Sequence, residues 1–217
     1  MMEHPVHQGS EAWHLLRLGR PTASEFDRLV TPLGKVKTGD GPQTYLYEKL
    51  AEHLTGKPLD DGSTWAMSQG SLLESEAIPF YELVYGAEVR KVGFVTTDDM
   101  RIGCSPDGLI GEDSGLECKC ALPQTHLRYL LEGGVPKEYV AQVQGCMFVT
   151  QRPRWVFLSY CRKMPPHIVH VERDEAFQQA LTAALNQFLA NFDNALEKLE
   201  TLSQITRAVK RATMEAV

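Results

Sequence analysis

The sequence predicts a single α/β (α+β) domain in which helices flank a mixed central sheet of about five strands. Its 217 residues are enough for one ordinary domain and too few for two. Hydrophobic residues make up 43% and charged residues 23%, the balance of a globular protein, which excludes disordered, collagen-like and solenoid chains. Helical periodicity dominates both ends of the chain and strand patterns lie between them, an order of elements that is typical of this class.

The N-terminal segment is expected to be helical. Apolar residues recur at helical spacing over residues 13–30 and are interrupted near residues 19–21, which predicts two short helices around a turn. Thr22 and Glu25 fit a capping box, in which Thr22 is the N-cap of the second helix. Residues 31–42 collect Gly, Pro, Thr and two Lys, a composition typical of an exposed and mobile loop.

Two longer helices follow. An amphipathic pattern predicts one over residues 45–54, which Gly56 would close. Another is expected over residues 70–85 with Gly86 as its terminator. Pro79 should kink this second helix, because proline cannot donate the backbone hydrogen bond of a helix interior.

The strands are expected in the middle of the chain, where short β-branched or alternating segments are separated by Gly, Asp and Pro. They cover residues 88–97, 101–104, 116–120, 155–160 and 168–172. A crossover helix over residues 137–150 separates the third strand from the fourth, and the last 40 residues form one long amphipathic helix. The sheet should therefore be mostly antiparallel, and residues 1–217 form one domain with a core over roughly 1–200 and a tail over 201–217.

The chain is expected to be cytosolic, without a membrane span. No apolar run approaches the roughly 18 to 20 residues that a span needs, and residues 1–8 hold no apolar signal segment. The five Cys are an odd number for an unsecreted chain, so reduced thiols are expected instead of a disulfide framework. The absence of a C-x-x-C pair argues against a structural zinc site.

The net charge bears on the kind of partner. It is −6, with an isoelectric point of about 5.7, which disfavours a nucleic acid, because non-specific binding is mostly counterion release by Lys and Arg. However, a carboxylate-rich cleft becomes electropositive once it holds divalent cations, and basic side chains can gather on one surface. The charge therefore lowers the expectation of a nucleic-acid partner without excluding it.

Two acids and one amine are expected to converge on neighbouring strands. Side chains alternate along a strand, so Glu117 and Lys119 should face one side while Leu116 and Cys118 face the core. A hairpin can bring Asp107, at the end of the preceding strand, next to Glu117. The alternative is an ordinary turn Asp beside a surface salt bridge.

Such a cluster suits metal-assisted hydrolysis of a phosphodiester. Carboxylates and a backbone carbonyl are hard oxygen ligands for Mg²⁺, and the ion lowers the pKa of a bound water and neutralises phosphate charge. Lys119 can hold or deprotonate that water. Glu74, on an otherwise apolar helix face, is a further candidate ligand, because a buried carboxylate is costly unless it is paired or bound to metal. Its alternative is a solvent-facing position.

Seven motifs widen this pattern over nearly the whole chain. They are QGSEAWHLLRLG (8–19), TASE (22–25), GSLLE (70–74), CSPDGL (104–109), GLECKC (115–120), YVAQVQ (139–144) and VERDE (171–175). In content and order they resemble the PD-(D/E)XK nucleases, and within them the family of bacteriophage lambda exonuclease and its phage and prophage relatives.

The resemblance implies a restriction-endonuclease-like fold and a Mg²⁺-dependent exonuclease, with Mn²⁺ as a substitute and two ions per site. This enzyme processively digests one strand of linear duplex DNA from a phosphorylated 5′ end and leaves a 3′ single strand for recombination by strand annealing. By motif, Asp107, Glu117 and the backbone carbonyl of Cys118 would bind metal, Lys119 would activate water, and Glu74 would complete the site.

The resemblance also implies a group that grips the 5′-terminal phosphate. The matching positions are Arg17, Ser24, Ser105 and Gln142, a guanidinium and neutral donors that suit a phosphate. The alternatives are a packing role for Arg17 beside Trp13 and local capping roles for the two Ser. Gln142 and Gln144 lean to opposite faces of a helix, so at most one should reach the site, and Gln142 is favoured.

The resemblance further implies a homotrimeric ring around a tapering DNA channel, a phage single-strand annealing protein as partner, and a bacterial host cytosol as location. Lys35 and Lys37, together with Arg20, are candidates for the channel wall. Met67 or Trp65 matches the apolar residue that wedges the strands apart. Two other functions stay open: a restriction-type endonuclease and a DNA-end binding protein without catalysis.

Overall fold

The structure is a computed structural model that describes residues 1–59 and 65–215, with side chains described for residues 1–59, 73 and 75–204. In chain order the elements are β1 (Met2–His4), α1 (Glu11–Arg17), the 3₁₀ helix η1 (Ala23–Arg28), α2 (Asp40–Thr55), α3 (Trp65–Tyr85), β2 (Val89–Arg90), β3 (Phe94–Thr96), β4 (Gly103–Cys104), β5 (Gly108–Ile110), β6 (Ser114–Lys119), α4 (Pro123–Glu132), α5 (Lys137–Thr150), β7 (Arg154–Ser159), β8 (His167–Glu172) and α6 (Glu175–Glu215). Helices therefore flank a set of short central strands, as the sequence predicts.

A mixed five-stranded sheet of order β2-β5-β6-β7-β8 forms the centre of the fold. Only β6 and β7 pair in parallel among these strands, and the connection between them runs through α4 and α5. The other neighbours are antiparallel. The predicted mixed sheet of five strands is confirmed, although the crossover contains two helices instead of one.

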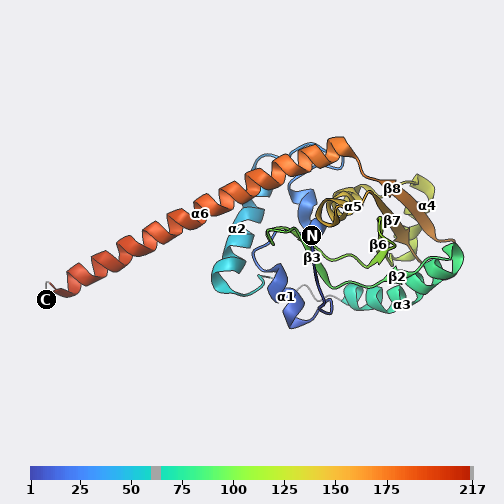
Figure 1. Cartoon of the computed structure of the whole chain (residues 1–217), viewed down its shortest axis with the longest axis horizontal. Coiled ribbons are helices and arrows are strands. Elements are labelled where there is room, and N and C mark those ends of the chain that lie inside the picture. The colour runs from blue at the N-terminus through green and yellow to red at the C-terminus, as the bar shows by residue number, and fades with distance from the viewer. Residues whose placement is uncertain (60–64, 216–217) are drawn as a thin grey trace.

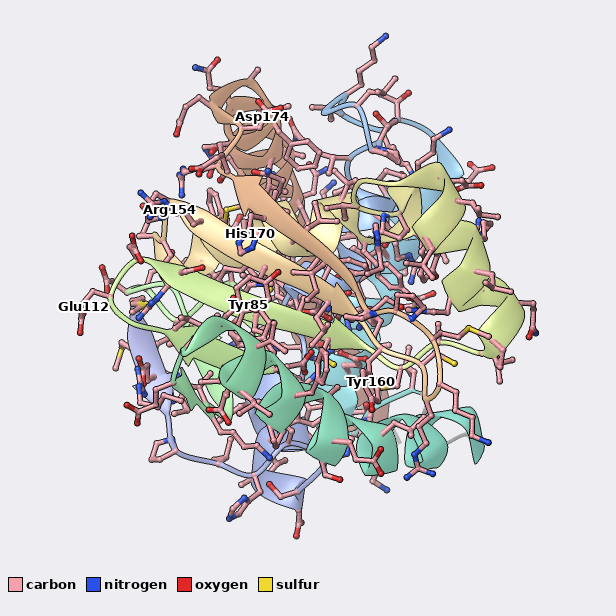
Figure 2. The ribbon with its side chains drawn as sticks, turned by 90° about the vertical axis from the view of Figure 1, so that its right-hand side faces the viewer. Tyr85, Glu112, Arg154, Tyr160, His170 and Asp174 are labelled. Carbon is pink, nitrogen blue, oxygen red and sulfur yellow. The ribbon has the colours of Figure 1, made fainter. Side chains whose placement is uncertain are left out.

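Helices cover both faces of this sheet (Figure 1). On one face α3 packs on the apolar side of β6 and β7, where Leu116 and Cys118 are buried. Figure 2 shows α3 crossing the sheet, with its Tyr85 beside His170 of β8; the two rings lie 5.6 Å apart. The opposite face carries α5, and η1, α2 and α6 continue the core beyond it. Alternation along β6 therefore leaves Glu117 on the α5 side.

The predicted strand over residues 88–97 is wrong, because this segment divides between two sheets. β2 pairs with β5 in the central sheet, whereas β3 joins β1 and β4 in a separate three-stranded sheet. Gly93 lies between the two strands, and a Cβ there would be 1.8 Å from the carbonyl oxygen of Val6. The close approach of the N-terminal segment thus bends the chain out of the central sheet at this glycine.

The segment after residue 21 also differs from the prediction. Thr22 precedes a 3₁₀ helix, and its side chain does not cap the backbone of that helix as a capping box would. Instead the Thr22 hydroxyl donates to the Glu25 carboxylate at 3.3 Å. The loop predicted over residues 31–42 ends early, at the start of α2. A hydrogen bond of 2.8 Å from Lys37 N to Leu29 O ties this loop to the end of η1.

The C-terminal helix α6 confirms the prediction of one long helix at the end of the chain. Phe177, Leu181 and Leu185 are buried against the core. Leu199 and Leu202 are exposed, and Figure 1 shows that this end of α6 extends away from the rest of the fold. Within the described ranges, no helix combines the length and the apolar character needed to cross a membrane.

Close packing of α5 on η1 gives a first prediction, that Gly145→Ala destabilises the fold. A Cβ at Gly145 would lie 2.4 Å from Cδ2 of the buried Phe26 ring and 3.1 Å from Cβ of Ala23. Overpacking of this kind costs about 1–3 kcal/mol, which exceeds the gain of up to about 1 kcal/mol from better helix propensity. Urea unfolding should show a net loss of about 1–2 kcal/mol. Gly41→Ala is the control, because nothing lies within 4 Å of its added Cβ; equal stability of the two variants would contradict the packing.

Candidate active site

Glu117 is the centre of an ionic cluster on β6. The residue is only 1% exposed, and its Oε1 lies 2.6 Å from the Nζ of Lys119. The same oxygen accepts a hydrogen bond of 2.5 Å from the Nε2 of Gln142, which comes from α5. The Lys119 ammonium also lies 5.1 Å from the ring centroid of Tyr139. The cluster is therefore built between β6 and the α5 helix that covers this face of the sheet.

Asp107 is fixed to the same strand by two backbone contacts. It precedes β5, and its N–H donates to the carbonyl of Leu116 at 3.2 Å. Its Oδ2 accepts from the N–H of Cys118 at 2.7 Å. Because Leu116 and Cys118 flank Glu117 along β6, the hairpin brings the two carboxylates together, and the structure places Asp107, Glu117 and Lys119 in one cluster.

The charges of the cluster hold the lysine as an ammonium. Burial alone lowers the pKa of Lys119, but attraction by Glu117 and Asp107 and the hydrogen bond to Glu117 outweigh it. The net result is a pKa of Lys119 above its ordinary value. The ammonium thus balances one of the two carboxylates, and the cluster as a whole keeps a negative charge that a cation can neutralise.

The second oxygen of Glu117 tests whether the site suits a metal ion. Oε2 is buried and has no hydrogen-bond partner among the described residues. A buried, unpartnered carboxylate oxygen is costly unless a ligand completes it, and hard oxygen donors are those that Mg²⁺ prefers. No group of three or more His, Cys, Asp or Glu side chains suited to a metal occurs in the described part of the chain. Asp107, Glu117 and the Cys118 carbonyl nevertheless have the donor chemistry for Mg²⁺.

The third acidic candidate lies on α3. Glu74, Trp65 and Met67 fall on this helix, but their side chains lie outside the described residues. Ser75 and Ile78, which follow Glu74 by one residue and by about one turn, line a cleft of about 760 Å³ that Asp107 also borders. The helix therefore runs past the cleft at the position of Glu74.

A second group of polar side chains forms around Arg17. Its guanidinium nitrogens lie 3.4 Å from Ser105 Oγ, 3.3 Å from Ser24 Oγ and 3.1 Å from Thr22 Oγ1. Trp13 supports this arrangement, because its indole N–H donates to Ser105 Oγ at 2.9 Å while Arg17 stacks 4.5 Å above its ring. Burial lowers the pKa of Arg17, and nearby acids oppose that effect. The structure thus brings Arg17, Ser24 and Ser105 together. Arg17 also packs on Trp13, so the packing role and the contact with the hydroxyls occur in the same arrangement.

Gln142 lies apart from these hydroxyls in its contacts, because its amide donates to Glu117. Gln144 donates instead to the carbonyl of Glu172 and accepts from the N–H of Asp174, so it fastens α5 to the start of α6. Only Gln142 reaches the ionic cluster. Gln142 therefore belongs to the ionic cluster by its contact with Glu117 and not to the group of hydroxyls around Arg17.

The remaining basic candidates have different surroundings. Lys35 and Lys37 are exposed in the turn before α2. Arg20 donates to the backbone carbonyls of Leu16 and Met100, so its guanidinium fixes local structure. Sequence reasoning did not include Thr22 or Trp13 in the Arg17 group; the signal was their place within the same two motifs that supplied Arg17 and Ser24.

Comparisons with known proteins identify the family. The YqaJ-like viral recombinase domain matches residues 12–153, a range that contains every candidate site residue named above. The chain belongs to this family. The protein ExoD of Escherichia coli (strain K12), which has no characterised function, is 31% identical to this YqaJ-like chain over 68 residues, or 30% of this chain and 78% of ExoD.

Solved structures agree with this assignment. The alkaline exonuclease LHK-Exo from Laribacter hongkongensis, in complex with dAMP, matches with a TM-score of 0.80 and 30% identity over 90% of this chain and 98% of its own. A phage-related exonuclease from Haemophilus somnus 129PT matches with a TM-score of 0.60 and 15% identity over 91% and 97%, which shows a shared fold. The resemblance to phage exonucleases is therefore confirmed, and the family is one of viral recombination.

Proposed function

We propose that this YqaJ-like protein is a Mg²⁺-dependent exonuclease that digests one strand of linear duplex DNA processively from a phosphorylated 5′ end. The product would be a 3′ single strand for phage-type recombination by strand annealing. One observation carries the proposal: Ser105 of the Arg17 group and Asp107 of the carboxylate cluster are two residues apart on one short segment. Two residues span at most about 7 Å, so neighbouring phosphates of one strand can reach both groups.

The carboxylate cluster would carry out the hydrolysis. Asp107, Glu117, the Cys118 carbonyl and Glu74 would hold two Mg²⁺ ions, or Mn²⁺ in their place. The buried Oε2 of Glu117, which finds no hydrogen-bond partner among the described side chains, supports this. When bound, the ions neutralise phosphate charge and lower the pKa of water. Lys119, as an ammonium, would orient the attacking water, and Gln142 holds the Glu117 carboxylate in place through Oε1.

The Arg17 group would set the polarity of digestion. A guanidinium with two hydroxyls recognises a terminal phosphate by charge-assisted hydrogen bonds. Each cleavage one nucleotide inward creates a new 5′-phosphate, which the same group can take up, so the enzyme moves forward along the strand. The complex of LHK-Exo with dAMP supports a nucleotide site on this fold.

We extend the proposal to assembly and partners on the family resemblance. The protein would act in the cytosol of a bacterial host as a homotrimeric ring, with the exposed Lys35 and Lys37 facing the duplex in its channel. Met67 or Trp65 of α3 would separate the strands. A phage single-strand annealing protein would coat the emerging 3′ strand.

End-labelled DNA tests this function directly. With Mg²⁺, we expect the strand with a 5′-phosphate in a linear duplex, labelled at its 3′ end, to shorten stepwise. A covalently closed circle should stay intact, and chelation by EDTA should stop the reaction. Cutting of the closed circle would instead indicate a restriction-type endonuclease. Binding to ends without any shortening would indicate an end-binding protein, and both results would contradict the proposal.

A further inference from the structure

Lys49 is a buried cation that is connected to the Arg17 group through Glu25 and Thr22. It lies on α2 and is only 6% exposed, and its Nζ is 3.1 Å from a carboxylate oxygen of Glu25 and 3.1 Å from one of Glu52. A lysine is rarely buried unless it is paired, and here both partners are acids. Glu52 in turn accepts a hydrogen bond of 3.1 Å from the N–H of Gly19, in the turn after Arg17.

A short chain of contacts connects Lys49 to Arg17. The Oε2 of Glu25 that contacts Lys49 also accepts from the Thr22 hydroxyl at 3.3 Å. Thr22 Oγ1 itself accepts from Arg17 at 3.1 Å. The phenol of the buried Tyr45 also donates to Glu25 at 3.3 Å, and burial raises the pKa of Tyr45, so this donor stays neutral. A single hydroxyl, that of Thr22, therefore connects Glu25 to the Arg17 guanidinium that is proposed to bind phosphate.

The balance of charge in this chain of contacts explains what Lys49 contributes. Glu25 and Glu52 both attract Arg17 electrostatically, as the causes of its pKa shift show. Glu25 also attracts Arg28, so Arg17, Lys49 and Arg28 together balance these acids. Without Lys49 the surroundings of Arg17 would be more negative by one charge, which would disfavour binding of a phosphate dianion. With Lys49 present, its ammonium offsets part of the negative charge of Glu25 and Glu52 where it arises, so an anion that binds Arg17 is repelled less by these acids.

We propose that Lys49 is a positioning residue that determines the specificity of this site for a 5′-phosphorylated end. It acts through Glu25 and Glu52, whose charge it neutralises, and it has no contact of its own with the DNA. This inference rests on the proposed function of the Arg17 group.

The alternative is that Lys49 only fastens η1 to α2. A second ion pair makes that distinction possible, because Arg28 of η1 donates to Glu48 of α2, at 3.1 Å through one of its nitrogens. This pair joins the same two elements and has no hydrogen bond to Thr22 or Glu25 among the described residues, although Glu25 also attracts Arg28 electrostatically. Glu48→Gln weakens this connection without adding negative charge near Arg17, so it serves as a control for a purely mechanical role.

The test compares binding and digestion of duplexes that differ only in a 5′-phosphate or a 5′-hydroxyl. Dissociation constants are measured in EDTA by fluorescence anisotropy, and kcat and KM are measured in Mg²⁺. For Lys49→Met we expect the preference for phosphorylated ends to fall about tenfold, mainly through KM. For Glu25→Gln we expect the preference to rise about threefold, because the carboxylate charge is gone while the amide can still accept from Thr22. Lys49→Arg should retain most of the preference.

Opposite shifts in Lys49→Met and Glu25→Gln, with no fall of the preference in Glu48→Gln, would support the inference, since loosened packing would lower the preference in all three variants. Equal loss in Glu48→Gln, or a fall in Glu25→Gln, would overturn it. If Lys49→Met does not fold, the sign of the Glu25→Gln shift decides. A wild-type enzyme that digests both ends equally would overturn the inference together with the 5′-phosphate assignment, whereas failure of the variants alone would leave that assignment standing.

Discussion

Lys119→Ala is expected to abolish hydrolysis of duplex DNA while DNA binding persists. The ammonium lies 2.6 Å from Glu117 and is the cation of the carboxylate cluster, so its loss removes the group proposed to orient the attacking water. Loss of a group that acts on the reacting water costs about a thousandfold or more in rate. Single-turnover digestion of an end-labelled duplex in Mg²⁺ measures the rate, and anisotropy in EDTA measures binding.

The control for this variant is Lys198→Ala, which removes an exposed lysine on α6 and should change neither quantity. Lys119→Arg should not rescue the rate, because a planar guanidinium does not reproduce the compact ammonium. Circular dichroism and thermal unfolding show whether the variant is folded. Near wild-type digestion by folded Lys119→Ala would remove the lysine from the mechanism. A loss of digestion counts as a catalytic effect only if circular dichroism and thermal unfolding show that the variant is folded.

The central sheet and its ionic face could be predicted from sequence because they depend on local pattern. Alternation along β6 alone places Glu117 and Lys119 on one face. The short strands β1 and β5 have only three residues each, too few for a period to be visible, and β1 pairs with β3, which is distant in sequence. The division of residues 88–97 depends on the packing of the N-terminal segment on Gly93, a tertiary contact that no local pattern encodes.

The site shows the same limit. Arg17 and Ser105 are in contact although they are 88 residues apart in sequence. This contact was expected only from the family resemblance, not from spacing. The contact of Gln142 with Glu117 follows from the docking of α5 on the sheet. Lys49 was missed because a lysine on an amphipathic helix is usually exposed. A signal did exist, since Lys49 falls within the buried stripe that Tyr45, Leu46 and Leu50 form on α2.

Arg17→Ala is expected to erase the difference between phosphorylated and hydroxyl 5′ ends. Arg17 is the cation of its group and approaches three hydroxyls at 3.1–3.4 Å, so no described side chain of that group can replace its charge. A charge-assisted hydrogen bond to phosphate contributes about 1.5–3 kcal/mol, which corresponds to a preference of roughly tenfold to a hundredfold. Digestion of phosphorylated ends should fall by that factor, while digestion of hydroxyl ends, already slow in the wild type, should change little.

Arg17→Lys separates charge from shape in this prediction, because it keeps a cation on Trp13 but loses the planar fork that matches a phosphate, so an intermediate preference is expected. Arg101→Ala is the control: Arg101 forms an exposed ion pair of 2.5 Å with Asp193 and should leave the preference intact. Competition between phosphorylated and hydroxyl duplexes in one reaction measures the preference independently of enzyme concentration. A preference that survives in folded Arg17→Ala would place recognition of the 5′ end elsewhere, and with it the origin of the direction in which the strand is digested.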